Sequence, residues 1–256
     1  MTDAIQQARR LLLAEADRLS KVLAADKSRA RAPVTRRMHE VRQMLSPSYA
    51  FSSQAGQDLV VDQLMKSKRG GTFVDVGGYD GVTGSNTLFL ETRRGWTGVL
   101  VEPVPAQLAK AEIARTCPCM GVAVAAAEGE ADFIEISEGY TQMSGLADTY
   151  DETLLGTVRA DKRHKENVLR VQTKTLSGIL QDAGLMHPDF VSLDIEGGEI
   201  ASLQAFPFDK HNVRIWSVEN NTAGGEIKQI MNANGYELVE FCGPDEIYTK
   251  PENANK

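Results

Sequence analysis

From about residue 50 onward, segments with a strand pattern alternate with helical segments, and the alternation ends in two strands joined by only three residues. These last strands are YELVEFC (236–242) and EIYTK (246–250), with Gly-Pro-Asp between them. A connection this short joins antiparallel neighbours. The strand–helix alternation before it builds a parallel sheet with helices on both faces. The sequence therefore predicts an α/β fold whose mostly parallel sheet ends with one antiparallel strand.

The other expected elements follow from apolar periodicity. Strands are expected at 72–77, 98–103, 119–125, 131–137, 189–197 and 213–220. Helices are expected at 56–68, 85–94, 104–116, 175–184, 198–205 and 223–234. With its final hairpin, this order resembles the class I methyltransferases, a Rossmann-like fold with a seven-stranded sheet and an antiparallel C-terminal strand. Ordinary dinucleotide-binding domains lack that last strand.

The first 48 residues are expected to form a helical arm ahead of a single domain at 49–256. One helix is expected at 2–25 and a shorter one near 34–45, separated by an arginine-rich stretch (28–38) in which Pro33 interrupts the helix. Two interpretations stay open. The arginines belong to a solvated face, or the arm packs on a second subunit, giving a homo-oligomer, or over the active site.

Charge and hydropathy exclude several classes of partner. The net charge is −7, which argues against nucleic acid. Nowhere does an apolar run reach the roughly 18 residues that cross a membrane. The N-terminus shows no basic-then-apolar signal pattern, because acidic residues interrupt it. The expected location is the cytoplasm.

The turn after the first expected strand indicates the ligand. It runs from Asp75 to Gly81 as Asp-x-Gly-Gly-Tyr-Asp-Gly, at the position where such sheets bind ligands. It contains two aspartates and no lysine or arginine, so it would repel a pyrophosphate. S-adenosylmethionine offers ammonium and hydroxyl donors and has no phosphate, so it suits this turn.

Glu102 supplies the second clue. It ends the next strand, where an acidic side chain accepts hydrogen bonds from a ribose diol. NAD and S-adenosylmethionine share that ribose, so Glu102 fits both, and the turn without a phosphate site separates them. An NAD-dependent oxidoreductase is therefore disfavoured.

Five blocks together resemble the FkbM-type S-adenosylmethionine-dependent methyltransferases: SQAGQDLVVDQL, FVDVGGYDGVTGSNTLFLE, GWTGVLVEP, EGYTQMSGLADTYD and PDFVSLDIEGGEIASLQAF. The similarity covers about residues 52–250. It implies an O-methyltransferase whose acceptor is a hydroxyl of a sugar, glycan or small secondary metabolite. Tyr79 departs from the small or polar residue common at its position. The expected cofactor-binding residues are Gln54, Asp75, Gly77, Gly78, Tyr79, Asp80, Ser85, Asn86, Thr87, Glu102, Pro103, Ala125 and Asp194.

Two strand ends supply the candidate catalytic groups. Asp194 ends one strand, and Glu219 and Asn220 end the next. These three resemble the Mg²⁺ site of catechol-type O-methyltransferases, and oxygen ligands suit that ion. The alternative is metal-free, with Asp194 as the base or a cofactor contact and with Glu219 and Asn220 binding hydroxyls of the acceptor. Glu196 and Glu199 are expected to begin the following helix.

A long segment, 138–168, separates two expected strands and is interpreted as a lid or substrate loop. It contains His164, a further candidate base. A non-catalytic module that binds an adenosine cofactor and docks on a biosynthetic complex is the competing function. The sequence does not identify the acceptor.

Overall fold

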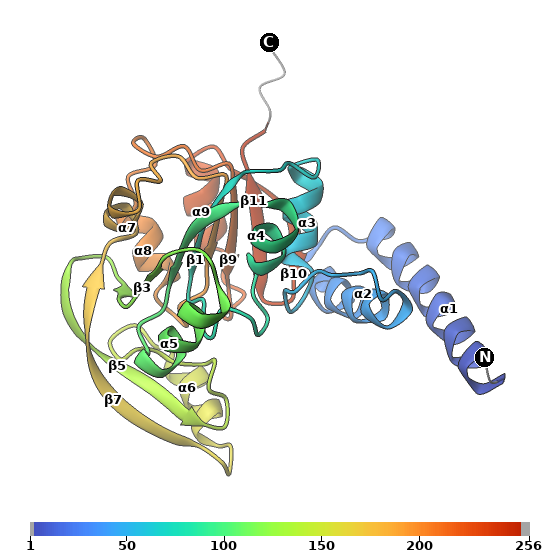
Figure 1. The fold of residues 1–256 in the computed structure, drawn as a ribbon, viewed down its shortest axis with the longest axis horizontal. Helices are drawn as coiled ribbons and strands as arrows, with labels where there is room; N and C mark the ends of the chain where they lie inside the picture. Colours follow the sequence, from blue (N-terminus) through green and yellow to red (C-terminus); the bar gives the residue numbers. More distant parts are fainter. Residues whose placement is uncertain (1–2, 252–256) are drawn as a thin grey trace.

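The computed structural model describes residues 3–251, and the predicted sheet lies at its centre. The strands of this sheet are β1 (Thr72–Val76), β2 (Thr97–Val101), β3 (Cys119–Met120), β8 (Phe190–Leu193), β9 (Ile215–Glu219), β10 (Glu237–Cys242) and β11 (Asp245–Thr249). Within the described residues their order is β10-β11-β9-β8-β1-β2-β3 (Figure 1). Only β11 runs antiparallel to its neighbours, β10 and β9. The predicted sheet, including its antiparallel C-terminal strand, is confirmed.

Helices cover both faces of this sheet because successive strand residues point to opposite sides. In β1, Val74 and Val76 join one apolar core and Phe73 joins another. The first core includes residues of α7 (Leu176–Asp182), α8 (Glu199–Ala205) and α9 (Glu226–Ala233). The second includes residues of α3 (Gln57–Leu64) and α4 (Leu88–Arg94), and α5 (Pro105–Ala114) follows β2. Burial on both faces explains the nearly continuous apolar strands.

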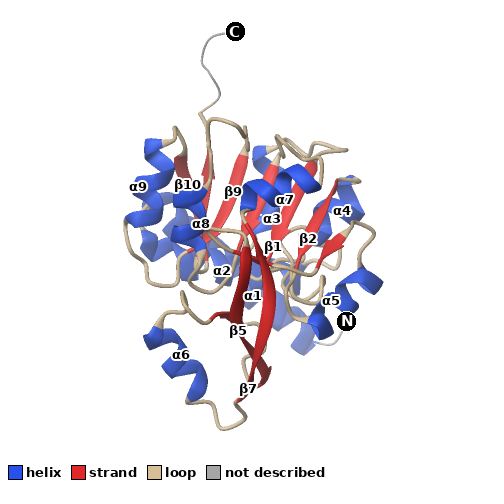
Figure 2. Ribbon diagram, turned by 90° about the vertical axis from the view of Figure 1, so that its left-hand side faces the viewer, coloured by secondary structure: helices blue, strands red, loops and turns tan. Residues whose placement is uncertain are grey.

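A second, smaller sheet was not predicted. Its strands are β4 (Ala123–Val124), β7 (Lys165–Lys174), β5 (Gly129–Glu138) and β6 (Gly145–Leu146), in that order. Figure 2 shows β5 and β7 side by side, extending below the main sheet near α6 (Glu152–Arg159).

Three expectations were therefore wrong. The strand at 119–125 is divided between the two sheets, the strand at 131–137 lies outside the main sheet, and 138–168 is not one loop. The strand β7 was not predicted because its composition is polar. Its exposed side chains pair with those of β5, as Arg170 does with Asp132 and Asn167 with Glu135.

The N-terminal segment forms α1 (Asp3–Ala25), the short 3₁₀ turn η1 (Arg29–Arg31) and α2 (Ala32–Leu45). The predicted break is present, and Pro33 lies in the first turn of α2, where its missing N–H costs nothing. Leu19, Met38 and Val41 form a small core between α1 and α2, and α1 projects from the side opposite β5 and β7 (Figure 1). None of the helices within residues 3–251 is both long and apolar enough to cross a bilayer.

Arg31 fastens this segment to β10. Its guanidinium is nearly buried and donates to both carboxylate oxygens of Glu240 and to the carbonyl oxygens of Leu23 and Asp26. Because the Arg31→Ala substitution strips Glu240 of this partner, it should lower the free energy of unfolding by about 2–4 kcal/mol, measured by urea denaturation. Arg37→Ala is the control: it removes an exposed pair with Glu40 and a weaker charge interaction with Glu15, and it should cost less than about 1 kcal/mol. Equal losses in the two variants would contradict this role of Arg31.

Candidate active site

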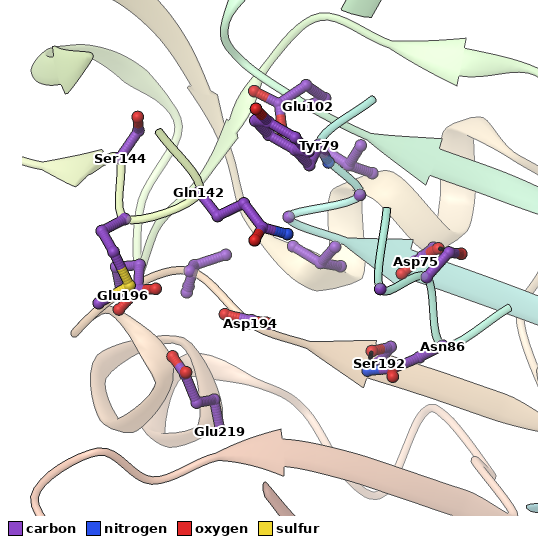
Figure 3. Close-up of a pocket in the computed structure, with 18 of the residues that line it drawn as sticks. Asp75, Tyr79, Asn86, Glu102, Gln142, Ser144, Ser192, Asp194, Glu196 and Glu219 are labelled. Carbon is purple, nitrogen blue, oxygen red and sulfur yellow. Dashed lines mark hydrogen bonds between the residues drawn. The ribbon is translucent and has the colours of Figure 1, made fainter. Parts of the chain in front are cut away.

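A cavity of about 480 Å³ lies at the edge of the main sheet where β1, β2, β8 and β9 end (Figure 3). The turn after β1 lines it together with Glu102, Asp194 and Glu219 from the other three strand ends. Further lining comes from residues 122–124, 139–144 and 146. The carboxyl ends of neighbouring parallel strands meet at one edge, so the fold gathers residues that are far apart in sequence.

The glycine turn brings the backbone of β1 against that of β8. Gly77 has φ +79°, and a Cβ atom at this position would lie 1.7 Å from the carbonyl oxygen of Asp194. The N–H groups of Gly77 and Gly78 both donate to the carbonyl of Val101, at 3.0 and 3.1 Å. Only glycine at position 77 allows this approach, and the turn thereby fixes Asp194 relative to β1.

Glu102 is a buried carboxylate held in one orientation. One oxygen accepts from the N–H of Tyr79 at 2.9 Å and the other from the N–H of Val104 at 2.8 Å. Burial raises its pKa to about 7, against the lowering effect of the two N–H donors. Each carboxylate oxygen keeps a second acceptor position, so Glu102 can still receive the two hydroxyls of a ribose.

The two aspartates of the turn have different surroundings. Asp75 lines the cavity, accepts a hydrogen bond from the Thr87 hydroxyl, and lies 3.6 Å from the buried guanidinium of Arg115. Asp80 folds back on its own turn and accepts from the N–H groups of Val82 and Thr83. Arg115, from the end of α5, therefore neutralises part of the negative charge behind the turn.

Three carboxylates meet at the ends of β8 and β9. Oxygens of Asp194, Glu196 and Glu219 lie within 4.8 Å of one another. Burial, reinforced by the neighbouring carboxylates, raises the pKa of Asp194 to about 8 and of Glu196 to about 9, and raises that of Glu219 as well. Among the described residues, Oε2 of Glu219 is buried without a hydrogen-bond partner. Such a cluster either retains protons or binds a cation.

The turn before α8 presents Glu196 to this cluster. Glu196 has φ +53°, an uncommon conformation for a residue with a side chain. The Glu199 carboxylate stabilises the turn by accepting from the N–H groups of Ile195 and Gly197, at 2.9 and 3.0 Å. Asn221 donates to Glu196 at 3.0 Å. Glu199 begins α8 as predicted, whereas Glu196 precedes the helix.

Residues 139–146 close the cavity from the side of the second sheet. The Tyr79 hydroxyl and the Thr141 hydroxyl are hydrogen-bonded at 2.7 Å, and Gln142 donates to the carbonyl of Thr83. Tyr79 itself has φ +49°. Tyr79, which departs from the pattern of related methyltransferases, thus joins the glycine turn to residues 139–146.

Residues 75–238 match the family model of the methyltransferase FkbM domain, which covers more than half of the chain. The chain belongs to this family. A search of curated proteins gave no match.

Several solved methyltransferases are similar to this FkbM-family chain in fold, at low identity. The FkbM methyltransferase from Methylobacillus flagellatus is 13% identical with a TM-score of 0.47; the match covers 93% of this chain and 57% of that one. A precorrin-6y C5,15-methyltransferase from Geobacter metallireducens is 11% identical with a TM-score of 0.44, over 81% of this chain and 94% of that one. A TehB-like enzyme from Corynebacterium glutamicum is 12% identical with a TM-score of 0.40, over 77% and 88%.

In this FkbM-family domain most of the residues expected to bind the cofactor line one cavity. They are Gln54, Asp75, Gly77, Gly78, Tyr79, Ser85, Asn86, Glu102, Pro103 and Asp194. Asp80, Thr87 and Ala125 are not among the lining residues. Thr87 is buried behind Asp75. The Ala125 N–H donates to the carbonyl oxygen of Lys174, and the preceding residues, 122–124, line the cavity instead.

Two catalytic candidates are not brought to the acidic cluster. Asn220 points elsewhere: its amide donates to the carbonyl of Gly224 and to Glu246, and Glu196 takes its expected place. His164 pairs with Glu166 at 2.9 Å and does not line the cavity, although its backbone lies beside the lining residue Gly139.

Sequence reasoning did not assign Glu196, Ser144 or Gln142 to the site. The Gly-Gly pair after Glu196 was the available signal, since it marks a turn directly after a strand end. Gln142 and Ser144 lie in the block EGYTQMSGLADTYD and in the segment interpreted as a lid or substrate loop, but neither residue was singled out, because the second sheet that positions them was not predicted.

Proposed function

We propose that this chain is an S-adenosylmethionine-dependent O-methyltransferase acting on a hydroxyl group of a sugar, a glycan or a small metabolite. We also propose that residues 49–256 form the catalytic domain and residues 1–48 an arm attached to it. The observation that carries the proposal is one cavity in which the oriented Glu102 carboxylate and the carboxylates of Asp194, Glu196 and Glu219 face a common space.

The cavity fits this cofactor. Its glycine turn carries no cationic side chain for a pyrophosphate, and Glu102 offers paired acceptor positions for a ribose. S-adenosylmethionine supplies a methyl group already activated on a sulfonium, so the chain needs mainly to align the acceptor and to take its proton.

Asp194 is the proposed base. A carboxylate with a pKa of about 8 is a stronger base than an ordinary one. It takes the proton of the acceptor hydroxyl while the new carbon–oxygen bond forms and the carbon–sulfur bond breaks. In this proposal Glu219, on the neighbouring strand, accepts a hydrogen bond from an acceptor hydroxyl.

The same carboxylates fit a divalent cation, in a ligand set that differs from the predicted one. Asp194, Glu196 and Glu219 would hold it, and Oε2 of Glu219, buried without a hydrogen-bond partner among the described residues, is an open ligand atom. Oxygen ligands of this kind suit Mg²⁺. A bound Mg²⁺ would lower the pKa of an acceptor hydroxyl and keep the three carboxylates ionised.

Glu102→Ala is expected to weaken binding of S-adenosylhomocysteine by about 2–4 kcal/mol, because it removes two charge-assisted hydrogen bonds to the ribose. Titration calorimetry measures this loss. Glu112→Ala, which changes an exposed acid on α5, is the control and should bind as the wild type does. Wild-type affinity in Glu102→Ala would remove Glu102 from the cofactor site.

The proposal as a whole is tested by transfer of a radiolabelled methyl group to candidate hydroxylated acceptors, with mass spectrometry of the products. Labelled product confirms catalysis. Calorimetric binding without turnover on any acceptor would favour the competing function, a non-catalytic adenosine-binding module.

A further inference from the structure

The cavity is acidic, and a single cation lines it. Six carboxylates line it: Asp75, Glu102, Asp194, Glu196, Glu219 and Asp245. Within residues 3–251, Arg36 is the only lysine or arginine among the lining residues. It comes from α2, outside the region that matches the family model.

Contacts of α2 on both sides place Arg36 there. Towards one side, the carbonyl of Ala32 accepts from the N–H of Gly243, in the turn between β10 and β11. Towards the other side, His39 packs against Gly56: a Cβ atom added to Gly56 would lie 3.4 Å from Nδ1 of the His39 ring. Arg36 therefore lies between the β10–β11 turn and the segment that precedes α3.

Arg36 is only weakly engaged by the protein. Its one ion pair among the described residues is a 3.7 Å contact with Glu40, and half of its side chain is exposed. Gln54, which precedes α3, also lines the cavity and packs over Gly84, and no hydrogen bond to its amide is found in the described part of the chain. A guanidinium and an uncommitted amide N–H₂ together suit a carboxylate.

An acceptor for an ammonium group lies in the same cavity. Asn86 is buried, and its amide nitrogen donates to Ser192 at 2.9 Å. Its Oδ1 has no hydrogen-bond partner among the residues described. A buried acceptor left in this state is costly unless a ligand donates to it.

We propose that Arg36 and Gln54 bind the carboxylate of the cofactor's amino-acid end, with its ammonium group donating to Oδ1 of Asn86. This inference rests on the proposed function. The amino-acid end carries both charges, and its carboxylate enters a cavity lined by six others, so it needs a cation. Arg36 is the lining residue that supplies one, and the N-terminal arm thereby becomes part of the active site.

Two ligands that differ only in this region test the proposal. S-adenosylhomocysteine has the amino-acid end, and 5′-methylthioadenosine lacks it. In calorimetry with the full chain, Arg36→Ala should bind S-adenosylhomocysteine about tenfold more weakly and 5′-methylthioadenosine equally well. Gln54→Ala should show a smaller loss with the same selectivity. Arg37→Ala, one residue away and also paired with Glu40, is the matched control and should bind both ligands normally.

Each other outcome has a distinct meaning. Unchanged affinity of Arg36→Ala for S-adenosylhomocysteine, or an equal loss for both ligands, overturns the role of Arg36. An unchanged cofactor affinity with a raised KM for the acceptor assigns Arg36 to the acceptor and also overturns it. If the wild type binds neither ligand, the proposed function itself fails.

Discussion

Asp194→Asn is expected to lower the rate of methyl transfer by about 10²–10⁴-fold, the usual effect of removing a general base. Asparagine keeps the shape of the side chain and loses the ability to accept the proton. The measurement is kcat with saturating cofactor, so that a change in cofactor affinity does not enter the measured rate. Asp209→Asn, at an exposed position, controls for unspecific loss. Full activity in Asp194→Asn would exclude Asp194 as the base and as an essential metal ligand.

A chelator distinguishes the metal-dependent mechanism from the metal-free one. If a divalent cation takes part, EDTA should abolish turnover and added Mg²⁺ should restore it. Calorimetry with Mg²⁺ alone should then show weaker binding in Glu196→Gln and Glu219→Gln and unchanged binding in Asn220→Ala, since the Asn220 amide is engaged by Gly224 and Glu246. Unaltered turnover in EDTA would leave Asp194 as a metal-free base.

The free energy of unfolding is expected to fall as the pH rises from about 5 to 9 in the absence of divalent cations. Asp194, Glu196 and Asp245 have pKa values of about 8, 9 and 6 in the folded protein, all raised by burial from 3.8, 4.5 and 3.8. Between these limits the folded state retains protons that the unfolded chain has released, so each retained proton lowers stability by about 1.4 kcal/mol per pH unit.

Urea denaturation at pH 5.5, 7 and 8.5 measures this slope. Asp194→Asn should make it shallower, because an amide has no proton to lose in this range. Added Mg²⁺ should also reduce it if the cluster binds the ion, since a bound cation stabilises the ionised carboxylates. A stability that stays constant or increases up to pH 8.5 would show that the cluster is already ionised at neutral pH.

The main sheet could be predicted because its signals are local. Buried parallel strands are apolar runs, and the three residues between β10 and β11 permit only a hairpin. The same holds for Asp75, Glu102 and Asp194. Asp75 lies near the end of β1, Glu102 and Asp194 directly follow β2 and β8, and parallel strands place their carboxyl ends together. Predicting that these residues lie together required only the order of the strands.

The second sheet and the full acidic cluster depend on information that is not local. The strand β7 has few apolar residues and is held by its pairing with β5, 27 or more positions earlier in the chain. Glu196 reaches the cluster through a left-handed backbone conformation stabilised by Glu199, and no periodicity reports such a conformation. Asn220 is predicted as a metal ligand because it adjoins Glu219 in the sequence, but successive residues of a strand point to opposite sides, so the two side chains diverge.

The insertion of β11 between β9 and β10 has a consequence for the folding of this protein during its synthesis on the ribosome. Synthesis delivers β10 before β11, yet within residues 3–251 of the finished sheet β11 is the only strand that β10 pairs with. Until Asp245–Thr249 have emerged, β9 presents an open edge and β10 has no place in the sheet. Open edges recruit strands from other chains. The nascent chain therefore carries an unpaired strand β10 beside an open β9 edge until those five residues have emerged, and only then can the sheet be completed.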